Sequence, residues 1–188
     1  MKDNCKKIRR LLSENDVHAT LENMADKIAL WAKPGCAILM GMASRGVPMA
    51  KSIAEILESK YKLSVPVGSL DTSYYRDDFH YRMRTNSQSL KVSEMPADVE
   101  GKTVVLIDDV LYTGRSVRAA LQAILDLGRP SVVKLCVLVD RGRRELPIAP
   151  DYTGLAIETE PRQEVRVRLN PHDEETAVWL VEIEGDVA

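Results

Sequence analysis

The 188-residue sequence lacks the features that mark several classes of protein. Its three cysteines, Cys5, Cys36 and Cys136, lie far apart and form no Cys-x-x-Cys pair, which argues against a disulfide framework and against a zinc site. No apolar run reaches the roughly 18 residues of a membrane helix, and residues 1–10 are too polar and charged for a signal peptide. We therefore expect a cytoplasmic protein with no membrane partner.

An excess of charge of one sign is also missing. Lysine and arginine number 26, aspartate and glutamate number 28, and the formal net charge is −2, so nothing attracts the whole chain to nucleic acid. Any basic surface must be local. The sequence contains neither Gly-x-x-x-x-Gly-Lys-[Ser/Thr] nor Gly-x-Gly-x-x-Gly, and it therefore predicts neither a Walker-type nucleotide loop nor a dinucleotide-binding turn.

The most informative stretch is 104–116, Val-Val-Leu-Ile-Asp-Asp-Val-Leu-Tyr-Thr-Gly-Arg-Ser. Its first four residues form an apolar run without alternation, which is typical of a parallel strand buried on both faces. Asp108 and Asp109 follow at the strand end, where open α/β sheets place ligands. Thr113 and Gly114 then lead into a helix, whose N-terminal N–H groups attract a phosphate. The alternative interpretation is a buried strand, a capped helix and two solvated carboxylates.

Strand and helix patterns alternate along the rest of the chain. We expect one domain over residues 1–188, with 1–15 loosely held, and a parallel sheet flanked by helices. Residues 72–96 are polar and aromatic without a clear period, and we interpret part of them as a lid, with a solvated hairpin as the alternative. The expected helices run from 15 or 16 to about 34, from 48 to 60 and from 117 to 128, and the expected strands cover 36–40, 63–70, 104–107, 132–139, 157–159, 165–169 and 177–181.

Polar loops follow three of these strands, at residues 43–46, 108–116 and 140–144. Because parallel strands end at one edge of a sheet, we expect the loops to meet there. A phosphate cradle, an acidic pair and an Arg-bearing glycine loop suit a substrate with phosphate at one end and pyrophosphate at the other. The two carboxylates suit ribose hydroxyls between them, and they also suit Mg²⁺ bound through water.

Residues 104–116 resemble the signature with which type I phosphoribosyltransferases bind phosphoribosyl pyrophosphate (PRPP). Three further blocks resemble the PyrR family, the pyrimidine operon attenuator proteins that also act as uracil phosphoribosyltransferases. These blocks are Pro-Val-Gly-Ser-Leu-Asp at 66–71, Tyr-Arg-Asp-Asp at 75–78 and Leu-Val-Asp-Arg-Gly-Arg-Arg-Glu-Leu-Pro-Ile at 138–148. The similarity covers residues 15–183 or thereabouts.

The resemblance implies the type I phosphoribosyltransferase fold, an α/β fold with a flexible loop, here 72–96, and a small C-terminal hood of strands within 148–183. It also implies that uracil and PRPP give UMP and pyrophosphate, with Mg²⁺ as cofactor, held through PRPP and through Asp108 or Asp109 by way of water. The implied catalytic residues are Arg45, Arg76, Asp108 and Asp109; the implied PRPP-binding residues are Ser44, Arg45, Gly46, Asp108, Asp109, Val110, Leu111, Tyr112, Thr113, Gly114, Arg115 and Ser116; and the implied nucleobase-binding residues are Val139, Asp140 and Arg141.

RNA binding is the second activity that the resemblance implies. The helix expected at 16–27 is acidic on balance, where better-known members carry basic residues, and this weighs against RNA. Arg143 keeps a positive charge where the family usually has histidine. Three functions stay open: a uracil phosphoribosyltransferase with or without RNA-dependent regulation, a phosphoribosyltransferase for another base, and a nucleotide-sensing RNA-binding regulator with vestigial catalysis. The resemblance also implies a homodimer or a tetramer.

Overall fold

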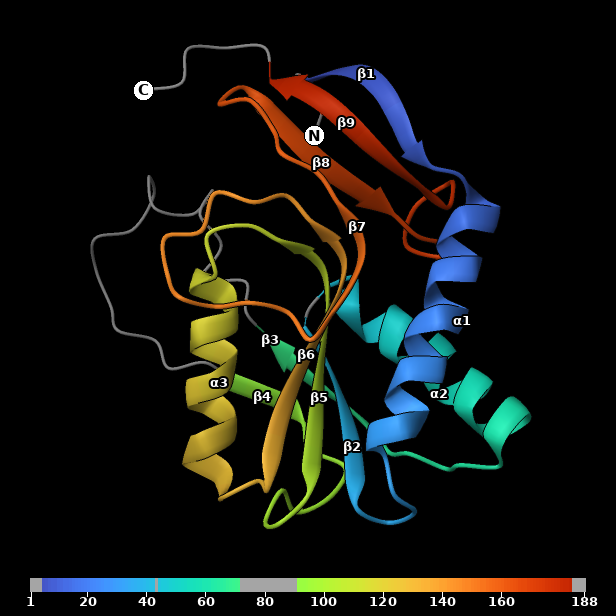
Figure 1. Ribbon diagram of the computed structural model, residues 1–188, viewed down its shortest axis with the longest axis vertical. Helices are drawn as coiled ribbons and strands as arrows, with labels where there is room; N and C mark the ends of the chain where they lie inside the picture. The colour runs from blue at the N-terminus through green and yellow to red at the C-terminus, as the bar shows by residue number, and fades with distance from the viewer. Residues whose placement is uncertain (1–4, 43, 72–90, 184–188) are drawn as a thin grey trace.

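The computed structural model describes residues 5–42, 44–71 and 91–183, which form two sheets and three helices (Figure 1). The larger sheet has the strand order β4-β3-β2-β5-β6-β7, and the smaller sheet has the order β1-β9-β8. The elements are β1 (Cys5–Leu12), α1 (Glu14–Trp31), β2 (Ala37–Met42), α2 (Gly46–Tyr61), β3 (Val67–Asp71), β4 (Lys91–Glu94), β5 (Thr103–Leu111), α3 (Arg115–Leu127), β6 (Val132–Asp140), β7 (Tyr152–Ala156), β8 (Gln163–Arg168) and β9 (Ala177–Ile183).

Five strands of the larger sheet run parallel, and β4 is antiparallel at one edge. Helices α1 and α2 cover one face of this sheet, and α3 covers the other (Figure 1). The central strands carry unbroken apolar runs because both of their faces are covered by helices. The predicted α/β fold, a parallel sheet flanked by helices, is confirmed.

Helix α1 begins earlier than predicted. Ser13 caps it: the Ser13 hydroxyl accepts the Asp16 N–H at 3.3 Å, and the Asp16 carboxylate accepts the Ser13 N–H at 2.8 Å. The sequence predicts a helix that starts at residue 15 or 16, but Asp16 takes the third helical position instead. The apolar face of the helix is buried at Val17, Leu21, Met24, Ala25 and Ile28, and Trp31 at its end is partly buried.

The expectation that residues 1–15 are loosely held is wrong for residues 5–12. They form strand β1, which pairs antiparallel with β9 and lies far from it in sequence. The side chains of β1 are mostly exposed, so backbone pairing holds the strand in place more than burial does. Only Leu11 and Leu12 pack against the core.

The hood also differs from its prediction. In place of a strand at 157–159, the chain forms β7, which pairs with β6 and so belongs to the larger sheet. The hood therefore consists of β8 and β9, as expected within 148–183, together with β1 from the other end of the chain. It stands over the carboxyl ends of the parallel strands (Figure 1).

Two further boundaries matter for the site. Strand β5 continues to Leu111, so Asp108 and Asp109 lie within the strand rather than after it. Residues 91–94 form β4, which pairs with β3. The expectation of an irregular segment over 72–96 is therefore wrong for 91–94. Residues 72–90 lie outside the described residues. Among the helices that the structure describes, none is long and apolar enough to cross a membrane.

Candidate active site

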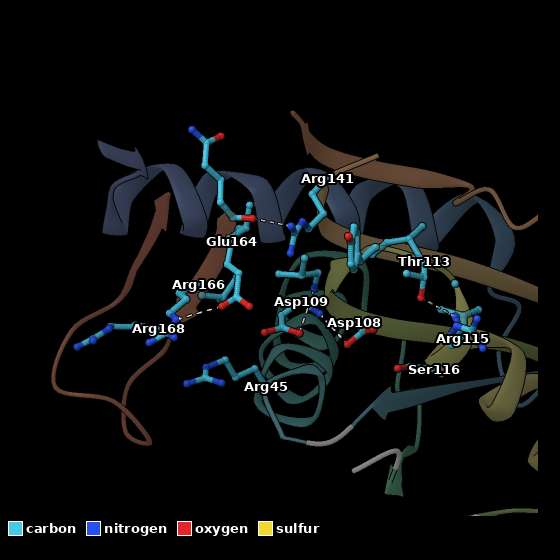
Figure 2. Close-up of a pocket in the computed structure, with 18 of the residues that line it drawn as sticks. Arg45, Asp108, Asp109, Thr113, Arg115, Ser116, Arg141, Glu164, Arg166 and Arg168 are labelled. Atoms are coloured by element: carbon cyan, nitrogen blue, oxygen red, sulfur yellow. Dashed lines mark hydrogen bonds and ion pairs between the residues drawn. The ribbon is translucent and has the colours of Figure 1, made fainter. Parts of the chain in front are cut away.

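A cleft of about 860 Å³ lies between the larger sheet and the hood. The predicted loops meet in it: the first supplies Arg45, the second supplies its whole length, and the third supplies Arg141. The opposite wall comes from the hood. Figure 2 shows Arg45, Asp109, Arg141 and Arg166 directed toward a common space, with Thr113, Arg115 and Ser116 grouped on one side of it.

The loop from β5 to α3 presents a helix N-terminus to the cleft. Gly114 is the N-cap of α3 and has φ of 92°, a left-handed conformation that favours glycine. A Cβ there would lie 3.4 Å from Ile148. Since glycine has no side chain to cap the helix, the positive end of the α3 dipole is directed to the site. The Thr113 hydroxyl accepts the Arg115 N–H at 3.3 Å, and Glu145 binds the Arg115 guanidinium, which keeps the loop compact.

The turn from β2 to α2 packs directly on the end of β5. A Cβ on Gly46 would lie 2.3 Å from the Ile107 carbonyl oxygen, so only glycine fits there. This close approach places Arg45, the N-cap of α2, near the acidic pair. Ser44, the third residue predicted in this loop, is exposed.

Arg45 forms a two-point ion pair with Asp173 in the turn between β8 and β9. Its Nε lies 3.2 Å from Asp173 Oδ2, and its Nη2 lies 3.1 Å from Oδ1. Burial raises the pKa of the Asp173 carboxyl, but hydrogen bonds from Arg45 and from the Leu169 N–H outweigh burial and hold the pKa below its usual value. Asp173 is therefore a charged partner for Arg45 at neutral pH.

The two predicted carboxylates are held by the backbone that follows them. Asp108 is buried, and its Oδ1 accepts the Asp109 N–H at 3.0 Å. The Asp109 Oδ1 accepts the Val110 N–H, also at 3.0 Å. No cluster of three or more His, Cys, Asp or Glu residues within the described residues suits a metal ion. The acidic pair therefore fits Mg²⁺ only as part of a coordination sphere completed by substrate oxygens and water, which is how Mg²⁺ is commonly bound.

Of the three predicted nucleobase-binding residues, only Arg141 lines the cleft. It is buried, its guanidinium carbon lies 3.9 Å from the centre of the Tyr112 ring, and its Nη2 donates to the Gln163 carbonyl at 2.6 Å. The Val139 side chain lies in the core beneath the site. The Asp140 carboxylate accepts the Gly142 N–H at 2.9 Å and binds the Arg144 guanidinium. It therefore stabilises the loop at 140–144.

The wall contributed by the hood was missed at the level of sequence. Glu164, Arg166 and Arg168 line the cleft, and Figure 2 shows all three on one side of β8. They alternate along β8 with buried Val165 and Val167, so the strand turns one polar face to the cleft and one apolar face to the core. This face lines the cleft only because of the position of the hood, which the sequence does not reveal. No pattern in the sequence marked Asp173 as a residue of the site. Arg76, a predicted catalytic residue, lies outside the described residues.

Comparison with known proteins identifies the family. The model of the phosphoribosyl transferase domain matches residues 6–172. The Bifunctional protein PyrR of Picosynechococcus sp. is 43% identical over 178 residues, which cover 94% of this chain and 98% of that protein. The Bifunctional protein PyrR of Pelotomaculum thermopropionicum is 44% identical, with 92% of this chain and 95% of that protein covered. The chain belongs to the PyrR family of phosphoribosyltransferases. The predicted family is thus confirmed.

Solved structures agree with the family at the level of fold. The hypoxanthine phosphoribosyltransferase of Trypanosoma cruzi superimposes with a TM-score of 0.71 at 16% identity and covers 95% of this chain and 98% of that one. A hypoxanthine-guanine phosphoribosyltransferase of Bacillus anthracis gives a TM-score of 0.69 at 15% identity, with 95% and 99% covered. This PyrR-family chain therefore has the type I phosphoribosyltransferase fold that its sequence predicted.

Proposed function

We propose that the chain transfers the ribose 5-phosphate group of PRPP to uracil, giving UMP and pyrophosphate. One observation supports this most: a helix N-terminus with glycine at its N-cap, an acidic pair and the Arg45 guanidinium line a single cleft in a member of the PyrR family. These groups match the 5′-phosphate, the ribose hydroxyls and the pyrophosphate of PRPP.

Each part of PRPP then has a partner. The loop of Tyr112, Thr113, Gly114, Arg115 and Ser116 holds the 5′-phosphate at the positive end of the α3 dipole. Asp108 and Asp109 accept hydrogen bonds from the two ribose hydroxyls, and the backbone bonds to their Oδ1 atoms fix the direction of the remaining oxygens. Arg45, with Ser44 and Gly46 in the same turn, binds the pyrophosphate.

The reaction breaks the bond between C1 of ribose and a pyrophosphate oxygen and forms one between C1 and N1 of uracil, which releases its proton. Positive charge grows on the ribose and negative charge on the leaving group, so fixed donors aimed at pyrophosphate lower the barrier. Arg45 is such a donor, and the carboxylates beside the ribose stabilise the developing cation. Mg²⁺ bound to PRPP, with Asp108 or Asp109 reached through water, would neutralise further charge on the pyrophosphate.

The base binds under the hood in this proposal. Arg141 is buried with its guanidinium against Tyr112 and its Nη2 on the Gln163 carbonyl, which makes that corner of the cleft rigid. A rigid polar corner can select a base by its hydrogen-bonding edge. Arg76, in the predicted flexible loop, is proposed to close over the reactants and exclude water.

A base panel tests the enzyme. The purified chain is incubated with PRPP, Mg²⁺ and uracil, or with hypoxanthine, guanine, adenine or orotate in its place, and pyrophosphate release is measured. We expect release with uracil alone. Release with another base only would favour a different phosphoribosyltransferase, and no release with any base would favour a nucleotide-sensing regulator.

We propose a second function, UMP-dependent binding of pyrimidine leader RNA, which fits the word bifunctional in the relatives' names. One observation supports it: Lys6, Lys7, Arg9 and Arg10 are all exposed on β1. Phosphate neutralisation by such groups supplies much of RNA affinity. Filter binding to leader RNA, with and without UMP and at two salt concentrations, tests it. Binding that is insensitive to UMP and salt would contradict it.

The oligomeric state, a dimer or tetramer, stays a prediction. Sedimentation of the purified protein with and without nucleotide tests it.

A further inference from the structure

The Arg45–Asp173 ion pair connects two parts of the cleft that are remote in sequence. Arg45 belongs to the turn before α2, on the floor of the site, and Asp173 belongs to the turn between β8 and β9 in the hood. Their side chains are 28% and 18% exposed, so the pair is largely shielded from water. Ion pairs of this kind with two parallel hydrogen bonds fix direction as well as distance.

Asp173 is itself held in place by two hydrogen bonds to the Leu169 backbone. Its Oδ2 accepts the Leu169 N–H at 2.9 Å, and its own N–H donates to the Leu169 carbonyl at 2.9 Å. Leu169 is 6% exposed and belongs to the core. The carboxylate is thus anchored to the core through Leu169, and a displacement of Asp173 would require this turn to open.

The pairing leaves one edge of the Arg45 guanidinium for a ligand. Asp173 takes Nε and Nη2, and within the described residues Nη1 has no hydrogen-bond partner. Arg45 lines the cleft, and Figure 2 shows its side chain below Asp109 with the guanidinium toward the side of Arg166. An arginine presents five N–H donors in a fixed plane, so an anion can bind one edge while a carboxylate holds the other.

We propose that Asp173 is a positioning residue, which holds Arg45 so that its Nη1 edge binds the pyrophosphate of PRPP. This inference rests on the proposed function. Asp173 contacts neither substrate; it acts through Arg45 alone. Its carboxylate also compensates part of the arginine charge when no substrate is bound, which keeps the side chain extended.

The test compares the wild type with Asp173→Asn and with Glu174→Gln as a matched control. Glu174 is the exposed neighbour of Asp173 in the same turn, and its change removes the same charge. We expect Asp173→Asn to raise the KM for PRPP and the Kd for Mg-pyrophosphate, measured by calorimetry, about tenfold, the effect of losing one charged hydrogen bond. The KM for uracil and the values for Glu174→Gln should stay unchanged.

A double-mutant cycle shows whether Asp173 acts through Arg45. Arg45→Ala should weaken pyrophosphate binding more than Asp173→Asn does, and the two changes together should be no worse than Arg45→Ala. Additive losses would overturn the inference. So would tighter pyrophosphate binding by Asp173→Asn, because the ion pair would then be a restraint that the ligand must break.

Two failures can be told apart. A wild type that releases no pyrophosphate with any base refutes the proposed function. Calorimetry with Mg-pyrophosphate would still measure how Asp173→Asn changes the Kd for pyrophosphate. An active wild type whose Asp173→Asn variant has the same KM for PRPP refutes the role of Asp173 alone. A uracil KM that rises as much as the PRPP KM, with a lower Tm, would make Asp173 merely structural and would also overturn the inference.

Discussion

Replacing Arg144 by alanine should destabilise the whole floor of the cleft, because this side chain joins two of its loops. The Arg144 Nη1 donates to the Tyr112 carbonyl at 2.7 Å and to the Gly142 carbonyl at 3.1 Å, and Nε donates to the Ile148 carbonyl at 3.0 Å. Its Nη2 binds the Asp140 carboxylate. One guanidinium thus connects the loop between β5 and α3 to the loop that carries Arg141.

The magnitude follows from what the substitution leaves behind. Asp140 would keep the Gly142 N–H but lose its only counter-charge among the interactions described for it, and its side chain is only 19% exposed. Breaking a fully buried pair costs about 3–5 kcal/mol, and one lost hydrogen bond to a charged group costs about 1.5–3 kcal/mol. For this partly buried site we expect a loss of about 3 kcal/mol in the free energy of unfolding. In a chain of this length that loss lowers the Tm by about 6–12 °C.

Thermal unfolding followed by circular dichroism, with urea titration for the free energy, measures the change. Arg118→Ala is the matched control, since Arg118 is an exposed arginine on α3, and its Tm should stay within about 1 °C of the wild type. The KM for PRPP should also rise in Arg144→Ala, because the Tyr112 carbonyl loses its anchor. A loss under about 1 kcal/mol, or an equal loss in the control, would refute the reasoning.

Three further outcomes are expected. Asp109→Asn should lose most uracil phosphoribosyltransferase turnover and keep its Tm, since the side chain keeps its size and the backbone bond; wild-type turnover would remove Asp109 from the site. Gly46→Ala should lower the Tm and abolish turnover, because its Cβ would lie 2.3 Å from the Ile107 carbonyl oxygen, and a variant with normal Tm would contradict that packing. Burial raises the pKa of the Cys136 thiol to about 12, so in the native protein at pH 8 Ellman's reagent should modify exposed Cys36 quickly and Cys136 only after unfolding; a fast phase that survives Cys36→Ser with the same amplitude would contradict this.

The elements around the site were largely predictable because their patterns are local. The apolar run before Asp108 and the helical period after Ser116 depend on the strand and helix alone, and both elements are where the sequence placed them, apart from their ends. The ends differ because pairing with neighbouring strands extends β5 by four residues past Ile107. The cleft-lining residues 108–116 were predicted for the same reason, since they form one continuous stretch of the sequence.

Contacts between distant segments could not be predicted in this way. Nothing in the composition of residues 5–12 indicates pairing with β9, because the strand buries few side chains and its partner lies at the other end of the chain. Strand β7 has no alternation that would assign it to the larger sheet rather than to the hood. In both cases backbone hydrogen bonds, which carry no sequence signature, decide the element.

By itself the sequence determined the family, the α/β class and the loop that lines the cleft at the N-terminus of α3, because each is encoded in a continuous stretch of residue types. Only the tertiary structure decided that the charged face of β8 closes the cleft, and that Asp173 holds Arg45. The physical reason is the range of the interactions. Strand and helix periods act over a few residues, whereas an ion pair across 128 positions exists only once the hood stands over the sheet.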